Sequence, residues 1–182
     1  MKRIHVIGRK NHGKTTLVSE LIVRLTELGY RIGTIKHTHH DHELDTPGKD
    51  SHRHRTSGAS CVGILSPQLN ACFWNDVSAL ADERYAAFDP MFANCDLVIV
   101  EGDSQTGADK IEVWRESQSD VPLAVADVKI LAIVTVRLRV ENVDRCRPLG
   151  SITTKRRSYP LLDLTTLPKD EIKSSISSIS VK

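Results

Sequence analysis

The fold of this chain is decided by the stretch Gly8-Arg9-Lys10-Asn11-His12-Gly13-Lys14-Thr15. The stretch fits the pattern G-x-x-x-x-G-K-[ST] at every position, and it joins an apolar run, Ile4 to Ile7, to a segment of helical periodicity. The glycines allow a tight loop whose N–H groups turn inward, and the N-terminus of the following helix adds positive potential. The sequence therefore predicts a phosphate-binding loop between a strand and a helix.

A second stretch, Asp96-Leu97-Val98-Ile99-Val100-Glu101, places an acid at each end of an expected strand. At about 3.3 Å per residue the two carboxylates stand some 17 Å apart, so only one can lie near the phosphates. Ligands of parallel sheets bind beyond the carboxyl ends of the strands, which selects Glu101 and leaves Asp96 as a cap or turn residue. We therefore expect Lys14 to contact the phosphates, and Thr15 and Glu101 to hold Mg²⁺.

Apolar runs rich in β-branched residues alternate with segments of helical periodicity along the chain. This alternation predicts one α/β domain over residues 1–182, a P-loop NTPase-type three-layer fold with a mostly parallel central sheet. The expected strands are 4–7, 31–36, 61–65, 71–74, 97–100, 111–114, 130–134 and 161–164. The expected helices are 14–28, 77–88 with Asp76 as its cap, and a short one after Pro168, while residues 173–182 are expected to fray.

The composition is typical of a soluble globular protein, with 40% hydrophobic and 26% charged residues among 182. Lys and Arg number 25 against 23 Asp and Glu, a net charge of +2, which makes the chain a poor candidate for nucleic-acid binding. Its longest apolar runs fall far short of the roughly 20 residues of a membrane helix, and Met-Lys-Arg leads directly into the first expected strand, so we expect no secretory signal. We therefore expect a cytoplasmic protein that binds neither nucleic acid nor membrane.

The cysteines give no sign of a metal site or a disulfide framework. They are Cys61, Cys72, Cys95 and Cys146, and they form no C-x-x-C pair and no short Cys/His zinc spacing. We therefore expect reduced, mostly buried thiols in a reducing compartment.

Six of the eight histidines fall between residues 37 and 54, within a polar stretch, 37–59, that we predict to be a long functional loop. Interleaved acids would allow it to bind a transition metal. Lys36 directly precedes the stretch, and Lys49, Arg53 and Arg55 lie within it. These four cations would suit a nucleotide and substrate loop that contacts phosphates. Solvated or structural histidines are the third alternative. We favour anion binding, because no cysteine is interleaved and the ligand spacing is irregular.

Five stretches carry a resemblance to a known family. They are Gly8–Leu17 (GRKNHGKTTL), Gly29–His40 (GYRIGTIKHTHH), Pro47–Ala59 (PGKDSHRHRTSGA), Asp96–Gly102 (DLVIVEG) and Lys110–Arg115 (KIEVWR). In order and spacing they resemble the molybdopterin-guanine dinucleotide biosynthesis protein B (MobB) family over roughly residues 3–135. Many NTPases share the phosphate loop, whereas its combination with the other four stretches is much more specific.

The resemblance implies a dimeric GTP-binding protein with weak GTPase activity and with GTP and Mg²⁺ as ligands. It also implies a partner, a MobA-type guanylyltransferase that joins GMP to molybdopterin or its molybdenum form. Matched by position, the residues implied in nucleotide binding are Gly8, Asn11, His12, Gly13, Lys14, Thr15, Thr16, Lys36, His37, Arg53 and His54. Thr15 and Glu101 are implied to hold the metal, and Glu101 and Asp50 to take part in catalysis.

The sequence departs from the family pattern at two places, a pair of residues and a single residue. Asp103 and Ser104 stand where the family has an aromatic residue and a lysine, and Val136 stands where it has an aspartate. An aspartate there could accept hydrogen bonds from the guanine edge, and no N-K-x-D motif replaces it. We therefore expect weaker discrimination of GTP from ATP than in the family, with backbone groups or Asp127 as the next candidates for base recognition.

Three other functions stay open on the sequence. Stoichiometric nickel or zinc binding would indicate a metal-insertion GTPase of the nickel chaperone type, and a phosphorylated product would indicate a P-loop small-molecule kinase. Very slow turnover combined with tight partner binding would indicate a largely non-catalytic scaffold. A binding panel of GTP, ATP, Mg²⁺ and molybdopterin separates these classes.

Overall fold

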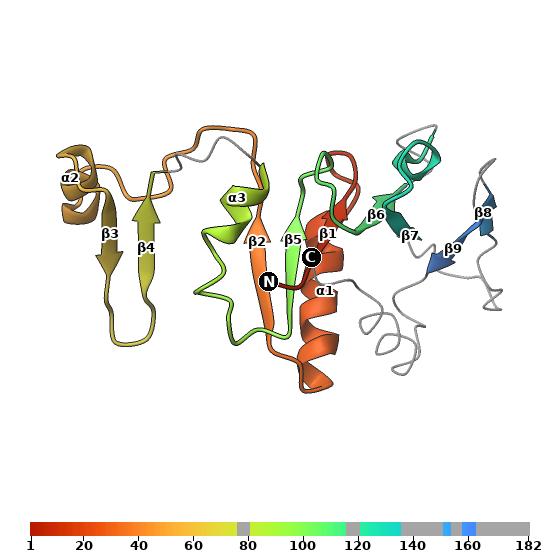
Figure 1. Ribbon diagram of the computed structural model, residues 1–182, viewed down its shortest axis with the longest axis horizontal. Coiled ribbons are helices and arrows are strands. Elements are labelled where there is room, and N and C mark those ends of the chain that lie inside the picture. The colour runs from red at the N-terminus through yellow and green to blue at the C-terminus, as the bar shows by residue number, and fades with distance from the viewer. Residues whose placement is uncertain (76–80, 116–120, 136–150, 154–157, 163–182) are drawn as a thin grey trace, which may run out of the picture. The chain divides into compact units, whose positions relative to one another are not determined.

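The computed structural model describes residues 1–75, 81–115, 121–135, 151–153 and 158–162 (Figure 1). The chain divides into two compact units. The sheet unit comprises residues 1–37 and the chain from residue 88 onward, and the hairpin unit comprises Thr38–Ala87. The single domain expected over residues 1–182 stays a prediction.

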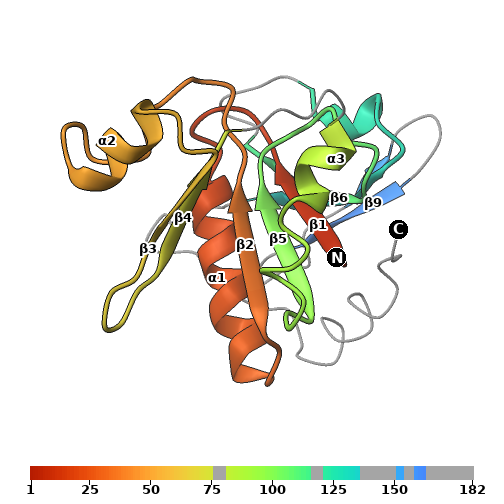
Figure 2. The same cartoon turned by 60° about the vertical axis from the view of Figure 1, so that its left-hand side comes forward.

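The sheet unit is built on a seven-stranded sheet with the order β2-β5-β1-β6-β7-β9-β8. Neighbouring strands from β2 to β9 are parallel, and β8 joins the edge antiparallel to β9. The strands are β1 (Arg3–Ile7), β2 (Ile32–Lys36), β5 (Leu97–Glu101), β6 (Lys110–Trp114), β7 (Ile130–Thr135), β8 (Ser151–Thr153) and β9 (Ser158–Leu162). Figure 2 shows β2, β5 and β1 side by side, with α1 (Lys14–Glu27) lying along them. The α/β class with a mostly parallel sheet is confirmed.

Up to β7, the expected strands and helix of the sheet unit are confirmed to within one residue at each end. The last expected strand, 161–164, is observed as β9, Ser158–Leu162, which begins three residues earlier, and residues 163–164 lie outside the described residues. Strand β8 was not expected, because three residues are too few to show an alternating pattern. The short helix after Pro168 and the frayed segment 173–182 lie outside the described residues. Of the helices that the structure describes, none has the length and apolar run that a bilayer crossing requires.

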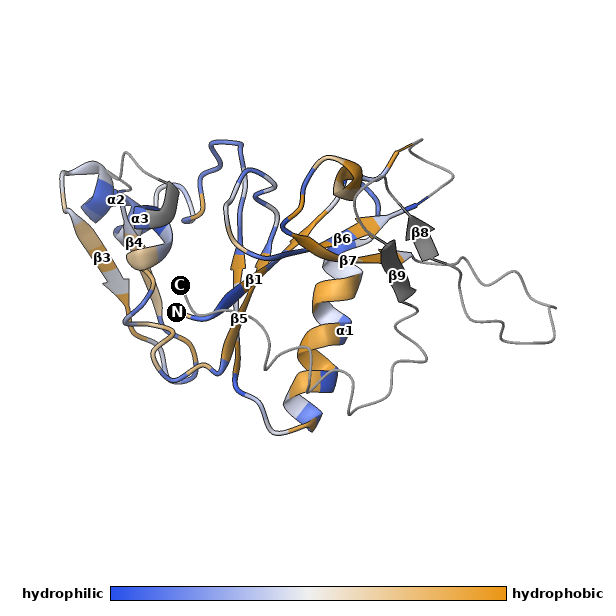
Figure 3. Cartoon of the chain, turned by 45° about the vertical axis from the view of Figure 1, so that its right-hand side comes forward, coloured by the Kyte–Doolittle hydropathy of each residue, from blue (hydrophilic) through white to orange (hydrophobic). Residues whose placement is uncertain are grey.

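One face of the sheet packs against α1 in an apolar core, and Figure 3 shows the apolar residues along β1, β5 and α1. The helix ends at Glu27 with Leu28 as its C-cap, and the next residue, Gly29, has a φ of +89° that suits the left-handed position after a helix. Burying a large aliphatic side chain contributes about 1.5–3 kcal/mol, so this core holds β1 and α1 firmly together. Its buried residues are Ile4, Val6, Leu17, Val18, Leu25, Leu97, Ile99, Val113 and Val134.

The opposite face buries charged side chains beside apolar ones. Lys110 is 2% exposed, and its Nζ donates to Asp127 Oδ2 at 2.9 Å. Glu112 accepts hydrogen bonds of 2.8 and 2.9 Å from the backbone N–H groups of Leu123 and Ala124 at the start of a short 3-10 helix, η1 (Leu123–Val125). The second oxygen of Asp127 accepts a hydrogen bond of 2.9 Å from the backbone N–H of Lys129, and a role of Asp127 in base recognition stays a prediction. These contacts compensate the buried charges.

His5 on the same face predicts an acid-sensitive step in stability. Burial lowers the pKa of His5 to about 4, although the carbonyl of Gly102 and the charge of Asp103 act to raise it. A folded pKa below the unfolded value of 6.5 means that protons bind the unfolded chain more readily. Stability is therefore lost as pH falls from about 6.5 to about 4, by about 3 kcal/mol. Urea unfolding followed across this pH range measures the loss.

The His5→Gln variant is expected to lose this pH dependence, while His54→Gln, which changes an exposed side chain, is expected to keep it. Burial also raises the pKa of Glu112, so this carboxyl group favours the folded chain as pH falls, which is opposite to the effect of His5. Glu112 is present in both the natural chain and His5→Gln, so its contribution cancels when the stabilities of the two chains are subtracted. An unchanged slope in His5→Gln would contradict the assignment.

The hairpin unit contains α2 (Asp50–Thr56), the antiparallel strands β3 (Cys61–Ile64) and β4 (Ala71–Trp74), and α3 (Ala81–Ala86). The hairpin was expected. The helix expected over 77–88 is observed in part as α3, and residues 76–80, with the expected cap, lie outside the described residues. The expectation of a loop throughout 37–59 is wrong for α2. This helix buries no residue and so shows no apolar stripe, but its acidic first turn and basic last turn suit the helix dipole.

The expectation of mostly buried thiols is wrong for the described cysteines. Cys61 and Cys72 are exposed, and Cys95 is partly exposed. Strands β3 and β4 form a two-stranded sheet in which both cysteines lie on exposed positions. Cys146 lies outside the described residues.

Candidate phosphate-binding site

The loop between β1 and α1 has the backbone conformation that its glycines permit. Gly8 has φ +145° and Gly13, directly before α1, has φ +101°. Asn11 also has a positive φ, 65°, which asparagine tolerates better than most residues. A Cβ on Gly8 would clash with the carbonyl oxygen of Val113 in β6, so the loop can pass this strand only with glycine there.

Lys14, the first residue of α1, is folded back onto this loop. Its Nζ donates to the carbonyl oxygens of Gly8 at 3.0 Å and Arg9 at 2.8 Å. Burial lowers the pKa of Lys14, while the nearby carboxylate of Glu101 acts to raise it. The ammonium is thus held by neutral carbonyl groups inside the loop, where a phosphate would supply stronger, charged acceptors.

Glu101, the last residue of β5, joins the loop through its carboxylate. Its Oε1 accepts a hydrogen bond of 2.9 Å from Thr15 Oγ1, and Lys36 Nζ at the end of β2 lies 3.9 Å from the same oxygen. A hydroxyl and a carboxylate are oxygen donors of the kind that Mg²⁺ prefers, so this pair fits the metal expected there. The expectation that Glu101 stands at the loop end of its strand is confirmed, since Asp96 instead accepts from the N–H of Arg31 at 2.7 Å.

The ends of β2 and β5 are tied together beside this pair. The N–H of His37 donates to the carbonyl oxygen of Glu101 at 2.9 Å. Gly102 has φ +100°, and a Cβ there would lie 3.1 Å from the carbonyl oxygen of His37. The structure thus brings the expected residues Lys36, His37 and Glu101 to one edge of the sheet with the loop, Thr15 and Thr16.

His12 connects the loop to β6 and to the residue directly after that strand. It is 2% exposed, burial lowers its pKa, and its ring hydrogen-bonds to the carbonyl of Val113. Its own carbonyl accepts a hydrogen bond of 3.1 Å from Arg115 Nε. Arg115 ends a stretch that resembles the family, but no role was predicted for it, because no loop motif includes a cation about one hundred residues away.

The remaining expected residues, Asp50, Arg53 and His54, lie on α2 in the hairpin unit. All three are exposed. Their predicted role toward the nucleotide stays a prediction.

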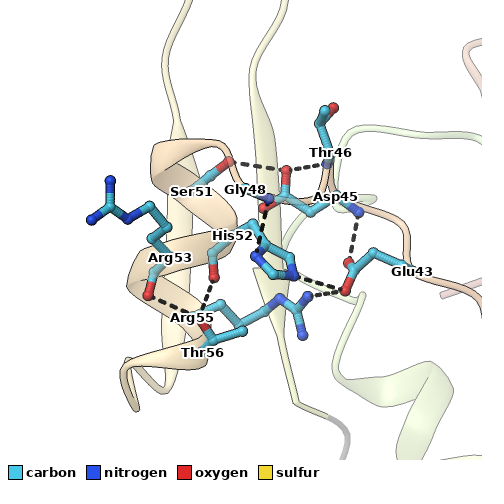
Figure 4. Close-up of polar contacts among 9 residues, drawn as sticks. All are labelled: Glu43, Asp45, Thr46, Gly48, Ser51, His52, Arg53, Arg55 and Thr56. Atoms are coloured by element: carbon cyan, nitrogen blue, oxygen red, sulfur yellow. Dashed lines mark hydrogen bonds and ion pairs between the residues drawn. The ribbon is translucent and has the colours of Figure 1, made fainter.

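The loop before α2 is held by its own acids (Figure 4). Glu43 accepts from Arg55 Nη2 at 2.5 Å and from the N–H of Asp45 at 3.0 Å, and these contacts lower its pKa. The buried Asp45 accepts from the N–H of Thr46 at 2.7 Å and from Ser51 Oγ at 2.9 Å. The two acids are therefore engaged within the unit. Among the residues that the structure describes, no group of three His, Cys, Asp or Glu side chains could hold a metal ion.

Comparisons with known proteins agree in pointing to one family. The family model of Molybdopterin guanine dinucleotide synthesis protein B (MobB) matches residues 3–136. The molybdopterin-guanine dinucleotide biosynthesis adapter protein of Escherichia coli strain K12 is 35% identical over 129 residues, which are 68% of this chain and 71% of that protein. The Haemophilus influenzae protein of the same name is 34% identical over 131 residues, 71% of this chain and 72% of that one. The crystal structure of Bacillus subtilis MobB is similar over 100% of both chains, with a TM-score of 0.61 and 17% identity.

Proposed function

The chain belongs to the molybdopterin guanine dinucleotide synthesis protein B (MobB) family, and we propose from this premise that it is a GTP-binding accessory protein of molybdenum-cofactor biosynthesis. It assists the attachment of GMP to molybdopterin, giving molybdopterin guanine dinucleotide, and hydrolyses GTP weakly. Its partners are a MobA-type guanylyltransferase, molybdopterin or its molybdenum form, and a second copy of this chain, in the cytoplasm. The names of its relatives, which are adapter proteins of this biosynthesis, support the accessory role.

One observation carries the nucleotide part of the proposal. Lys14 and Thr15 follow β1, Glu101 ends the neighbouring parallel β5, and the Thr15 hydroxyl donates to the Glu101 carboxylate at 2.9 Å. This edge, beyond the carboxyl ends of parallel strands, is where ligands of such sheets bind. A cation and a hydroxyl at a helix N-terminus, with a carboxylate beside them at the end of β5, suit a nucleoside triphosphate with its metal.

Each residue has a definite task in this proposal. Lys14 exchanges the carbonyls of Gly8 and Arg9 for phosphate oxygens, and Thr15 and Glu101 hold Mg²⁺. The metal neutralises charge on the β- and γ-phosphates when it is bound. Lys36, 3.9 Å from the Glu101 carboxylate, adds a second cation at the same edge.

The hairpin unit contributes the exposed side of α2 to the same proposal. Asp50 takes part in catalysis, and Arg53 and His54 contact the anionic ligand. Its support is that Arg53 and His54 are exposed, whereas the third cation of the helix, Arg55, is paired with Glu43 inside the unit.

The Glu101→Gln variant tests the metal part of the site. It keeps the shape of the side chain but removes its charge, so we expect Mg²⁺-dependent GTP affinity to fall by about 10- to 100-fold. GTP affinity without Mg²⁺ should change much less. Isothermal titration calorimetry of the full chain, with and without Mg²⁺, measures both affinities.

Asp96→Asn is the matched control, because it changes the acid at the other end of the same strand, where Asp96 meets Arg31. Loss of Mg²⁺ dependence in Asp96→Asn, and not in Glu101→Gln, would overturn the assignment.

ATP, molybdopterin and Ni²⁺ are titrated alongside GTP. A phosphorylated small-molecule product would favour the kinase alternative, and one tightly held Ni²⁺ per chain would favour the metal-insertion alternative. Val136 lies outside the described residues, so weak discrimination of GTP from ATP stays a prediction that the ATP arm decides.

A further inference from the structure

Two exposed thiols stand side by side on the hairpin of strands β3 and β4. The Sγ atoms of Cys61 and Cys72 lie 3.2 Å apart. Both residues are exposed, so dissolved oxidants and thiols can reach them. A disulfide has an S–S distance of about 2.05 Å, so the two sulfur atoms need to approach by only about a further 1.1 Å.

The strand register explains this approach. Cys61 pairs with Trp74, and Cys72 pairs with Gly63, so the two cysteines are diagonal neighbours on one face of the hairpin. Gly63 has no side chain, and a Cβ there would meet no atom within 4 Å. The space beside Cys72 is therefore open, which lets the two thiols turn toward each other.

We propose that Cys61 and Cys72 form a reversible dithiol–disulfide site on the hairpin unit, oxidised by a low-molecular-weight disulfide such as glutathione disulfide. The bond would close the 61–72 segment and fix the pairing of β3 with β4. A diagonal pair requires some adjustment of the strands, and strained, exposed disulfides are readily reduced again. The site is thus suited to switching and not to permanent cross-linking, and it does not depend on the nucleotide site.

The two thiols have different parts in the reaction. Hydrogen bonding to Cys61 raises the pKa of Cys72, so Cys72 is assigned the second, resolving attack. The Cys61 thiolate attacks one sulfur of glutathione disulfide, forming a mixed disulfide and releasing one glutathione thiolate. Cys72 then loses its proton and attacks the Cys61 sulfur, releasing the second glutathione. The two protein thiols lose two electrons, which glutathione disulfide gains, and two protons pass to the released thiolates or to solvent.

The tryptic digest of this chain isolates the pair. No Lys or Arg lies between Arg55 and Arg84, so Cys61 and Cys72 fall within one peptide, residues 56–84, without another cysteine. The full chain is equilibrated in glutathione buffers of rising disulfide content, and its remaining free thiols are then alkylated. The chain is digested with trypsin, and the masses of the peptides are measured by mass spectrometry. We expect the peptide to lose two hydrogen atoms and take up no alkyl group, in buffers where the Cys95 peptide is still alkylated.

The same buffers with urea-unfolded chain provide the reference. Because the fold holds the thiols together, the ratio of oxidised to reduced peptide should be at least about tenfold higher in the folded chain. In Cys72→Ser, Cys61 should stop at the mixed disulfide with glutathione, whereas Cys95→Ser should leave the pair unchanged. A peptide that carries two alkyl groups in every buffer, or two glutathione adducts, would overturn the proposal. An equal ratio in the folded and unfolded chains would also overturn it.

Discussion

Replacing Lys14 with alanine is expected to lower the affinity for Mg-GTP by roughly 30- to 4000-fold, the equivalent of about 2–5 kcal/mol for a buried charge pair. Lys14 is the cation that the loop holds at the N-terminus of α1, where its Nζ donates to the carbonyl oxygens of Gly8 and Arg9. Without it, the phosphates would lose the cation that the loop holds. Calorimetry with GTP and Mg²⁺ measures the loss.

Two measurements keep this result interpretable. Lys10→Ala removes an exposed cation from the same loop and should change affinity by less than tenfold, since exposed charges contribute about 1 kcal/mol or less. The thermal midpoint of Lys14→Ala should stay close to that of the natural chain, because the variant loses only two hydrogen bonds to carbonyls. Unchanged affinity in folded Lys14→Ala would remove the nucleotide-site assignment.

Gly8→Ala is expected to cost roughly 3–5 kcal/mol of folding stability, from backbone strain and a clash that the strand cannot relieve. Gly8 has φ +145°, and its added methyl group would meet the backbone carbonyl of Val113 in the central sheet. The clash also separates the loop from β6, so GTP binding should be lost together with stability. Urea unfolding monitored by circular dichroism gives the stability change.

Gly29→Ala is the matched control for the backbone strain alone. Gly29 has φ +89°, but a Cβ there meets nothing within 4 Å. We expect it to cost about 1 kcal/mol and to leave GTP affinity unchanged. Equal losses in the two variants would show that positive φ, and not the approach to Val113, makes Gly8 necessary.

The loop and its acid were predictable because their chemistry is local. Gly8, Gly13 and Lys14 stand at fixed spacing, and the polarity of a single strand was enough to choose Glu101 over Asp96. Periodicity located most strands because buried parallel strands are apolar on both faces.

The remaining features depend on contacts between distant residues. Lys110 and Glu112 look like solvated charges in the sequence, yet both are 2% exposed and compensated by partners 17 and 11 residues away. Arg115 reaches His12 across 103 residues. Helix α2 was missed because it buries nothing, so no apolar stripe marked it.

The order of strands also governs how the chain can fold as it is synthesised. Among the strands that the structure describes, β2 has β5 as its one neighbour and β1 lies between β5 and β6, so β1 and β2 are not paired with each other. About 60 residues separate β2 from β5, which takes the ribosome about 3 to 12 s. During that interval the apolar faces of β1, β2 and α1 lack β5 to pack against, so they are open to aggregation and to chaperone binding. The β3–β4 hairpin pairs locally, so it can form while the larger sheet is still incomplete.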